Sequence, residues 1–373
     1  MKAIRVIGMK HEEILTQKDV AKLLEWYRLN KRDLPWRQTK DPYCIWISEI
    51  MLQQTRVEAV KPYYARFMEE LPNVRALATV SEEKLLKLWE GLGYYSRARN
   101  LQRAARTVME QYGGVIPHSY DALRKLSGIG DYTAGAIASI AFGQRVPAID
   151  GNVLRVLARV TGSYDDIALP QTKKKWQESL LPTVPVEAGD FTQSLIELGA
   201  TVCVPNGEAK CAECPLAACC VASREHLLDE LPVRSAKKPR KIENKTVFVI
   251  VDGNRAALHK RPPTGLLAGL YELPNAEGAL TESEALQHLR TIGFEPLQLS
   301  RIDGAKHIFT HIEWHMIAYA VRIAPDFDGI DESHGYFLID VDDLRKNYAI
   351  PSAFSAYSKY LYEKPVAFFD RIG

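Results

Sequence analysis

With 373 residues and 46% hydrophobic content, the chain is long enough for two or three domains with full-sized cores. It has no uninterrupted apolar run of transmembrane length, so we expect a cytoplasmic, globular protein with no membrane partner. A formal net charge of +2 does not by itself indicate nucleic acid as a partner, because DNA binding depends on local patches of Lys and Arg.

Three segments of different character follow one another along the chain. Residues 1–230 consist mainly of helical patterns with apolar residues at three- and four-residue spacing, which predict an all-α domain. Residues 231–245 are basic and contain prolines, so we expect a linker. Residues 246–373 contain β-rich runs at 247–251 and 311–323 together with helical patterns, which predict an α+β domain.

Glu49 interrupts an apolar helical stretch, Cys-Ile-Trp-Ile-Ser-Glu-Ile-Met-Leu, at residues 44–52. Partial burial would raise the pKa of its carboxyl group and suit it to acid catalysis. The alternative is an exposed acid on a wet face of an amphipathic helix.

Two glycines, Gly128 and Gly130, lie in the segment Leu-Ser-Gly-Ile-Gly-Asp-Tyr-Thr-Ala-Gly-Ala-Ile at residues 126–137. The pattern predicts a helix, a tight turn and a second helix whose first N–H groups face a phosphate, as in a helix-hairpin-helix DNA contact. A purely structural turn is the alternative, because short glycine motifs are common.

Asp150 stands immediately before an amphipathic helical pattern at 151–159. A helix N-terminus favours the ionised carboxylate, and a simple N-cap role is compatible with catalysis. Hydrolysis at an anomeric carbon needs one protonated carboxyl group to assist the leaving group and one ionised carboxyl group to stabilise the sugar cation. Glu49 and Asp150 fit these two roles.

Five of the six cysteines fall between Cys203 and Cys220, in the pattern Cys203-x7-Cys211-x2-Cys214-x5-Cys220. Clustered thiolates suit an iron-sulfur cluster or zinc, whereas secreted disulfide frameworks usually spread their cysteines along the chain. A disulfide set and a zinc knuckle remain alternatives, and Cys219 is an alternative to the last ligand.

Taken together, the Ser-Glu-x-Met-Leu-Gln-Gln-Thr helix, the hairpin, the Asp-Gly-Asn turn and the cysteine loop resemble the helix-hairpin-helix glycosylases. The resemblance is closest to the MutY-type adenine DNA glycosylases, and it extends over nearly the whole chain through motifs at 32–37, 91–97 and 309–311. It implies a multidomain fold: an all-α helix-hairpin-helix glycosylase domain with an iron-sulfur cluster loop, followed by an α+β Nudix-like C-terminal domain.

The resemblance also implies the reaction and the partner. The expected enzyme flips out adenine that is mispaired with 8-oxoguanine or guanine in double-stranded DNA and hydrolyses its N-glycosidic bond. We expect a monomer associated with the nucleoid in a bacterial-type cytoplasm. A [4Fe-4S] cluster would be held by Cys203, Cys211, Cys214 and Cys220.

By the same resemblance, Glu49 protonates N7 of adenine and later activates water, while Asp150 stabilises the sugar cation, with support from Tyr132 and Asn152. Relatives that resemble endonuclease III have a lysine at the position of Tyr132, whose amine attacks the sugar and enables strand cleavage. We therefore expect a monofunctional enzyme.

Further DNA-contacting residues follow from the matching motifs. Trp36, Arg37 and Gln193 are similar to the positions that line the adenine pocket, Gln54 and Tyr94 to those that wedge into the duplex, and Phe309 and His311 to the loop that reads 8-oxoguanine. The expected substrate-binding and DNA-binding set is completed by Arg32, Gly128, Gly130 and Thr310.

Two features depart from the family pattern. The first cysteine gap holds seven residues where the family usually has six, and Thr310 replaces a serine. The segment 264–274 resembles the Nudix fold, yet the chain has no Arg-Glu-x-x-Glu-Glu helix for magnesium, so we expect no nucleotide hydrolysis.

Three other functions are compatible with parts of the sequence. They are a pyrimidine or mismatch glycosylase similar to endonuclease III, a non-catalytic iron-sulfur DNA-binding protein, and a Nudix hydrolase fused to a DNA-binding domain. Tyr132 argues against lyase chemistry, the presence of both Glu49 and Asp150 argues against a non-catalytic protein, and the missing acidic helix argues against a hydrolase.

Overall fold

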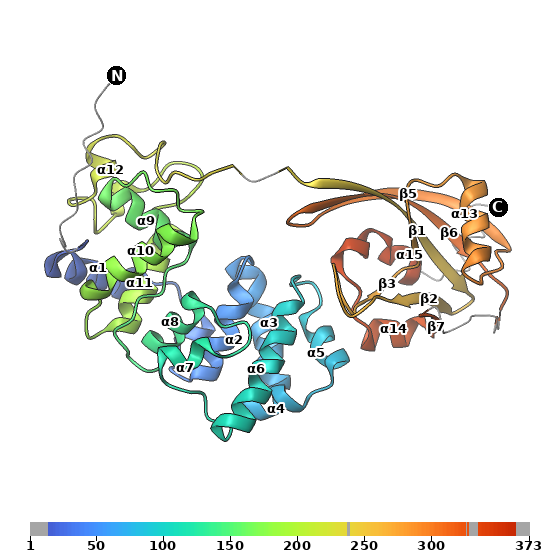
Figure 1. The fold of residues 1–373 in the computed structure, drawn as a ribbon, viewed down its shortest axis with the longest axis horizontal. Coiled ribbons are helices and arrows are strands. Elements are labelled where there is room, and N and C mark those ends of the chain that lie inside the picture. The colour runs from blue at the N-terminus through green and yellow to red at the C-terminus, as the bar shows by residue number, and fades with distance from the viewer. Residues whose placement is uncertain (1–13, 237–238, 326, 328–334, 363–373) are drawn as a thin grey trace. The chain divides into compact units, whose positions relative to one another are not determined.

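The computed structural model describes residues 14–236, 239–325, 327 and 335–362. Its chain divides into two compact units (Figure 1). The first unit comprises Met1–Thr79 and Arg99–Ala236, and the second comprises Val80–Ala98 and Lys237–Gly373.

The first unit is helical, as the spacing of its apolar residues predicts (Figure 1). Its α-helices are α1 (Gln17–Asn30), α2 (Pro42–Leu52), α3 (Val57–Glu70), α4 (Val74–Thr79), α6 (Ser96–Tyr112, which begins in the second unit), α7 (Tyr120–Arg124), α8 (Asp131–Ile140), α9 (Gly151–Thr161), α10 (Pro170–Leu180), α11 (Ala188–Thr201) and α12 (Val221–Arg224). Short 3₁₀ turns are η1 (Pro35–Arg37), η2 (Leu181–Thr183) and η3 (Cys211–Glu213).

Local chemistry sets the ends of α9, which carries part of the candidate site. Asp150 caps its first turn, and Gly162 ends it with φ of +68°, a left-handed conformation that glycine adopts without strain. Between these ends, apolar residues at helical spacing, including Val153 and Leu157, face a core shared with α1, α10 and α11. The packing of this face fixes the direction in which the N-terminus of α9 points.

The second unit is built on one sheet whose described strands are β1 (Lys241–Asp252), β2 (Arg255–Lys260), β3 (Tyr271–Glu272), β4 (Asn275–Glu277), β5 (Gln298–Ile308), β6 (Ile312–Arg322) and β7 (Tyr336–Asp340). The main strand order is β3-β2-β1-β6-β5, with β4 beside β1 and β7 beside β2. Strands β1 and β6 are parallel and the other pairs are antiparallel.

Alternate residues of β1 face opposite sides of this sheet, as a period of two requires. Val247 and Val249 face the core covered by α14 (Val341–Asn347), η5 (Ser352–Tyr357) and α15 (Ser358–Tyr362), whereas Phe248 and Ile250 face α13 (Glu282–Thr291). Figure 1 shows these helices on the two sides of the strands. The predicted fold class, a helical domain followed by an α+β domain, is confirmed.

The structure differs from the predicted domain limits at two places. Strand β1 begins at Lys241, so residues 241–245 of the expected linker are sheet, while residues 237–238 lie outside the described part. Helix α5 (Glu82–Trp89) belongs to the second unit, where Nζ of Lys87 donates to the Tyr348 carbonyl at 2.9 Å and the Ile350 N–H to Glu90 at 2.8 Å.

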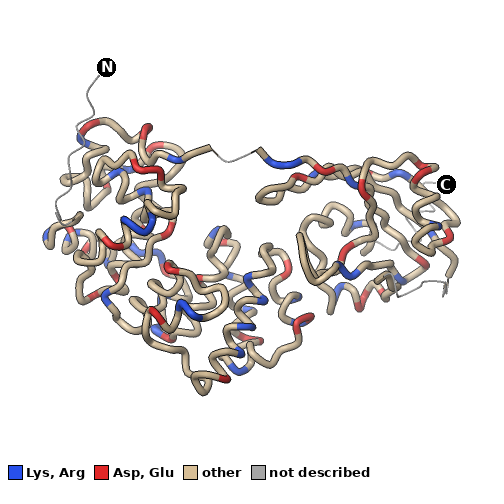
Figure 2. Tube along the Cα trace, viewed as in Figure 1, with Lys and Arg blue, Asp and Glu red and all other residues tan. Residues whose placement is uncertain are grey.

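Charged residues of both signs are interspersed along both units, which agrees with the small net charge (Figure 2). Basic residues follow one another where β1 begins. Among the helices that the structure describes, none is both long and apolar enough to cross a membrane.

Candidate active site

Glu49 lies near the end of α2, where it is only 7% exposed, so the alternative of an acid on a wet helix face is wrong. The hydroxyl of Tyr132, in the first turn of α8, donates to its Oε2 atom at 2.6 Å. Burial raises the pKa of Glu49 to about 7 against the lowering effect of this hydrogen bond, and the charge of Asp150 adds to the rise. Near neutral pH the carboxyl group is therefore divided between its acid and base forms.

Asp150 is the N-cap of α9. Its Oδ1 atom accepts the Val153 backbone N–H at 2.8 Å, and its Oδ2 atom accepts the Asn152 side-chain amide at 2.8 Å. Burial raises the pKa of Asp150, and these two hydrogen bonds oppose the rise. The net direction is opposite to the one that helix capping alone predicts, because the group is buried as well as capped.

The two carboxyl groups differ in the donors that they accept. Glu49 accepts a hydroxyl hydrogen bond, whereas Asp150 accepts two N–H groups at a helix N-terminus, where a negative charge is stabilised. Burial together with the charges of both acids raises the pKa of Tyr132, which keeps its hydroxyl protonated as a donor. Glu49 is thus suited to give up a proton, and the N–H donors at Asp150 favour its anion against the opposing effect of burial.

Arg155 connects Asn152, which donates to the Asp150 carboxylate, to the cysteine segment. Its Nη2 atom donates to Oδ1 of Asn152 at 2.9 Å and to the Gly199 carbonyl at 2.7 Å, while its Nε atom donates to the Cys203 carbonyl at 2.8 Å. A Cβ on Gly199 would meet Cβ of Asn152 at 2.6 Å, so α11 approaches α9 closely here. Sequence reasoning missed Arg155, because an arginine on an amphipathic helix usually faces solvent.

A second buried acid, Glu197 on α11, binds two of the expected substrate-binding and DNA-binding residues. Its carboxylate accepts Nε and Nη2 of Arg32, each at 2.8 Å, and Nη2 of Arg37 at 2.7 Å. Burial acts to raise the pKa of Glu197, but these hydrogen bonds outweigh it and lower the pKa to about 2. Sequence reasoning missed Glu197, although an acid within the apolar run Ser-Leu-Ile-Glu-Leu-Gly repeats the signal that Glu49 gave.

The three residues expected to line the adenine pocket are Arg37, Trp36 and Gln193. The positive charge of Arg37 is near enough to Glu49 to lower the pKa of that acid. Trp36 is buried, with its ring edge-on to Tyr64 at a centroid distance of 5.3 Å. Gln193 is half-buried on α11, four residues before Glu197 and hence on the same face of the helix.

The two hairpin glycines have different local requirements. Gly128 has φ of +76°, and a Cβ there would meet Cβ of Asn100 at 2.7 Å, so the turn itself requires glycine. Gly130 is the N-cap of α8 and has open space where a Cβ would stand. That space leaves the first N–H groups of α8 accessible to a ligand.

Gln54 and Tyr94, the expected wedge residues, both have left-handed backbones. Their φ values are +58° and +47°, and they are two of the four such non-glycine residues in the described chain. This conformation costs a residue with a Cβ roughly 1–2 kcal/mol. Gln54 is exposed between α2 and α3, and Tyr94 is 47% exposed in the second unit. Such strain concentrates at functional positions.

Four cysteines line one pocket beside α9: Cys203, Cys211, Cys214 and Cys220. Cys219 is not part of this lining, and its thiol instead donates to the Leu216 carbonyl at 3.3 Å. Nη1 of Arg159 donates to Sγ of Cys203 at 3.3 Å. In the part of the chain that the structure describes, no three His, Cys, Asp or Glu side chains are arranged to hold a single metal ion.

The remaining expected residues form the three-residue connection between β5 and β6 in the second unit. The Phe309 N–H donates to the Ile312 carbonyl at 2.9 Å, which closes the turn. Thr310 and His311 are exposed, and Oγ1 of Thr310 lies 3.0 Å from the Tyr94 hydroxyl. Phe309 is half-buried and packs against the core beneath the loop.

Comparison with known families agrees with this arrangement. The model of the HhH-GPD superfamily base excision DNA repair proteins matches residues 47–182, and the NUDIX domain model matches residues 246–360. The solved structure of a thermostable thymine-DNA glycosylase matches 55% of this chain and 95% of its own, with a TM-score of 0.51 and 30% identity. The helical unit with Glu49 and Asp150 is therefore that of a base excision DNA glycosylase.

Relatives define the family more narrowly. The adenine DNA glycosylase of Mus musculus is 35% identical over 362 residues, which cover 81% of this chain and 70% of the relative. The adenine DNA glycosylase of Buchnera aphidicola subsp. Acyrthosiphon pisum is 32% identical over 316 residues, which cover 84% of this chain and 89% of the relative. The chain belongs to the adenine DNA glycosylase family, and the resemblance found in its sequence is confirmed.

Proposed function

We propose that this enzyme removes adenine opposite 8-oxoguanine or guanine in double-stranded DNA by hydrolysing the N-glycosidic bond, without cleaving the strand. The observation that carries the proposal is the asymmetry of two acids, the buried Glu49 and the half-buried Asp150. Glu49, beside the Tyr132 hydroxyl, has a pKa of about 7, while Asp150 accepts N–H groups at the start of α9.

Access to the base requires extrusion from the duplex, which costs a few kcal/mol of stacking and pairing. Gln54 and Tyr94 supply a flat amide and an aromatic ring to replace the lost stacking. Their left-handed backbones support this role, because exposed side chains held in strained conformations are typical of functional sites. The open N-terminus of α8 at Gly130 is suited to hold a phosphate of the same strand.

The adenine pocket would be formed by Trp36, Arg37 and Gln193, and Arg32 shares the Glu197 carboxylate with Arg37. Glu197 supports this assignment, because its carboxylate fixes both guanidinium groups while its own pKa is held at about 2. Separating Glu197 from the two guanidinium groups would leave an uncompensated buried charge. Because that separation is costly, the three side chains should form a rigid cluster. Rigid groups hold a flipped base in one orientation for protonation.

In the reaction, protonated Glu49 donates its proton to N7 of adenine, and the C1′–N9 bond breaks with its electron pair leaving on the base. The sugar cation that remains is stabilised by the Asp150 carboxylate, which Val153 and Asn152 hold in place. Ionised Glu49 then removes a proton from water as the water oxygen bonds to C1′. A pKa near the working pH supports both steps.

Tyr132 supports the monofunctional assignment. Its hydroxyl is engaged with Glu49, and burial raises its pKa, so it is a poor nucleophile. The position has no amine that could form a Schiff base with the sugar. Hydrolysis should therefore leave an abasic site in an intact strand.

The second unit would read the partner base. Adenine in normal A·T pairs must be spared, so only the opposite base identifies the error. Phe309, Thr310 and His311 are placed in a short, closed turn that exposes a hydroxyl and an imidazole. These groups can accept or donate hydrogen bonds to the edge of a modified guanine.

A [4Fe-4S] cluster held by Cys203, Cys211, Cys214 and Cys220 fits the cysteine pocket. The four thiols surround a shared space, and each iron of such a cluster takes one thiolate. Burial raises the pKa of the Cys214 thiol to about 12, so bound iron would be needed to stabilise the thiolate. When bound, the cluster would link the loop after α11 covalently to the start of α12.

The proposal is tested by single-turnover base release from otherwise identical labelled duplexes with adenine opposite 8-oxoguanine, guanine or thymine. Alkali converts abasic sites to strand breaks and so reports base loss. We expect fast release opposite 8-oxoguanine, slower release opposite guanine, little opposite thymine, and no break without alkali. Failure to release adenine from any duplex would contradict the proposal and favour a pyrimidine or mismatch glycosylase.

A further inference from the structure

The ring of Phe309 packs on a group of side chains that we call the platform: His307, Trp314 and Lys245, which contacts the indole of Trp314. It lies edge-on to Trp314 of β6, with ring centroids 4.8 Å apart and an interplanar angle of 72°. The ring also lies edge-on to His307 of β5, with a centroid distance of 4.5 Å and an interplanar angle of 67°. Edge-to-face contacts of this kind fix the relative orientation of two rings.

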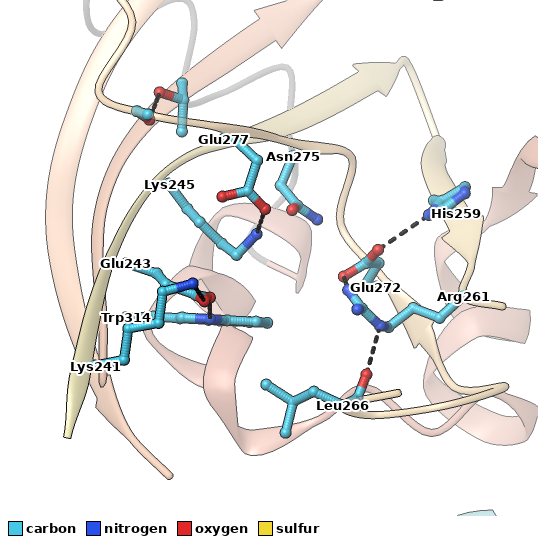
Figure 3. Close-up of polar contacts among 12 residues, drawn as sticks. Lys241, Glu243, Lys245, His259, Arg261, Leu266, Glu272, Asn275, Glu277 and Trp314 are labelled. Atoms are coloured by element: carbon cyan, nitrogen blue, oxygen red, sulfur yellow. Dashed lines mark hydrogen bonds and ion pairs between the residues drawn. The ribbon is translucent and has the colours of Figure 1, made fainter. Parts of the chain in front are cut away.

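Trp314 is itself held at several points. It is only 1% exposed, its Nε1–H donates to Oε2 of Glu243 at 3.1 Å, and its ring is in contact range of Phe354 at 6.1 Å. Nζ of Lys245 lies 4.9 Å from the centroid of the indole, within the range of a cation–π contact. Figure 3 shows Glu243 at the indole nitrogen and Lys245 on the neighbouring part of β1.

Lys245 is buried, which is rare for lysine and requires a specific partner. Its side chain is 7% exposed, and Nζ pairs with Oε1 of Glu277 on β4 at 2.6 Å. Lys245 pairs with Glu277 in the strand register, and His307 pairs with Trp314. Backbone pairing therefore fixes the spacing between the side chains of each pair. Glu277 is 78% exposed, which leaves the buried ammonium group partly dependent on the indole ring.

We propose that Trp314 and Lys245 are positioning residues for partner-base recognition: Lys245 clamps the indole, and the indole orients the Phe309 ring in the reading loop. The inference rests on the proposed role of this loop in reading 8-oxoguanine. It assigns to the buried sheet face beneath the loop a share of the discrimination between 8-oxoguanine and guanine. The groups involved are not expected to touch DNA.

A purely structural role makes a different prediction. Trp314 and Lys245 are both buried in the second unit. Their substitution would therefore lower stability whether or not they position Phe309. Only the positioning role also changes the preference between partner bases. A control variant is therefore needed that destabilises the same unit without touching the platform.

The full-length variants Lys245→Met and Trp314→Phe would be compared with Phe294→Leu, which alters a fully buried ring in the core on the opposite face of the sheet. The measured quantity is the rate of adenine release opposite 8-oxoguanine divided by the rate opposite guanine, at sub-saturating enzyme. We expect the two platform variants to lower this ratio about threefold to tenfold, the range for loss of a buried cation–π contact. Phe294→Leu should keep the wild-type ratio.

A second readout does not depend on activity. The NMR signal of the His307 Cε1–H group reports the Phe309 ring current, and it can be assigned with a His307→Gln variant. We expect this signal to move in Lys245→Met and Trp314→Phe and to stay in place in Phe294→Leu. Each variant should first give a cooperative thermal transition, so that unfolded protein does not contribute.

The outcomes separate the two hypotheses. A wild-type enzyme with equal rates opposite both partners would overturn the proposed reading role and with it the inference. A wild-type preference that both platform variants retain, with an unmoved His307 signal, would overturn the positioning role alone. A lowered ratio in Phe294→Leu equal to that of the platform variants would show that general destabilisation, rather than positioning, sets the ratio.

Discussion

The two units hold their key side chains in opposite ways. In the helical unit Glu49 is buried near the end of α2 and Asp150 is half-buried at the start of α9, and burial, hydrogen bonds and neighbouring charges adjust their pKa values. In the second unit Thr310 and His311 are exposed on a short turn, and order comes from the rings beneath them. Acid–base chemistry requires a controlled environment, whereas recognition requires accessible atoms on a rigid support.

The largest effect should come from removing the proton donor of the helical unit. Glu49→Gln keeps the shape of the side chain but cannot donate or accept the proton, so adenine release should fall by roughly 10²- to 10⁴-fold while DNA binding is retained. Single-turnover release and a gel-shift titration measure the two properties. Glu58→Gln, which changes an exposed acid in the first turn of α3, is the matched control, and near wild-type release by Glu49→Gln would refute the acid role.

Asp150→Asn should have the next largest effect. Asn is also a good N-cap, so α9 should persist, whereas the negative charge proposed to stabilise the sugar cation is lost. We expect a fall of roughly 10²- to 10³-fold in base release, the scale on which one electrostatic stabiliser acts. Asp166→Asn, which changes a half-buried acid that caps a turn elsewhere, serves as control. Equal loss of thermal stability and activity in both variants would indicate a structural effect.

Phe309→Ala should separate the two units functionally. Removing the ring should lower the preference for 8-oxoguanine over guanine by about tenfold, the scale of a truncated aromatic contact, with little change in release opposite guanine. The same duplexes and assay measure both rates. Leu297→Ala, an exposed apolar residue next to β5, should leave the preference unchanged. An equal fall opposite both partners would assign Phe309 to general DNA binding.

Tyr132→Phe should have the smallest effect and the most specific one. The Tyr132 hydrogen bond lowers the pKa of Glu49, so its loss should raise that pKa further above its ordinary value. The alkaline decline in rate should then move to higher pH by roughly 0.5–1 unit, the equivalent of one hydrogen bond. Tyr120→Phe, which loses a hydroxyl contact to Asp131, is the control whose profile should not move.

The fold was largely predictable from the sequence, and its exceptions have local causes. Helical periodicity and capping located α9, and the apolar run 247–251 located β1. The first part of β1 has the composition of a linker, with Lys241, Glu243 and Lys245 in alternation. These residues form a strand because β6 pairs with them over their whole length and because Glu277 and Trp314 satisfy the buried lysine. Such partners are distant in sequence.

The candidate site was predictable where its residues lie in long motifs. Glu49, Tyr132, Asp150 and Asn152 were expected to act together, and Tyr132 and Asn152 each contact one of the two acids. Glu197 interrupts an apolar run as Glu49 does, but its role could not be inferred from that signal, because its partner Arg32 is 165 residues away in the sequence. Burial and pairing, which create its role, appear only in three dimensions.

The pH dependence of adenine release by the wild-type enzyme tests the central claim most directly. In the proposed mechanism Glu49 must be protonated to act, and its pKa is about 7, so the single-turnover rate opposite 8-oxoguanine should decline about tenfold per pH unit above that value. Below it, the rate should decline where Asp150 becomes protonated, since burial raises the pKa of this acid. A single-turnover rate that stays constant from pH 6 to pH 9 (roughly the span in which Glu49 should ionise) would contradict the assignment of Glu49 as proton donor.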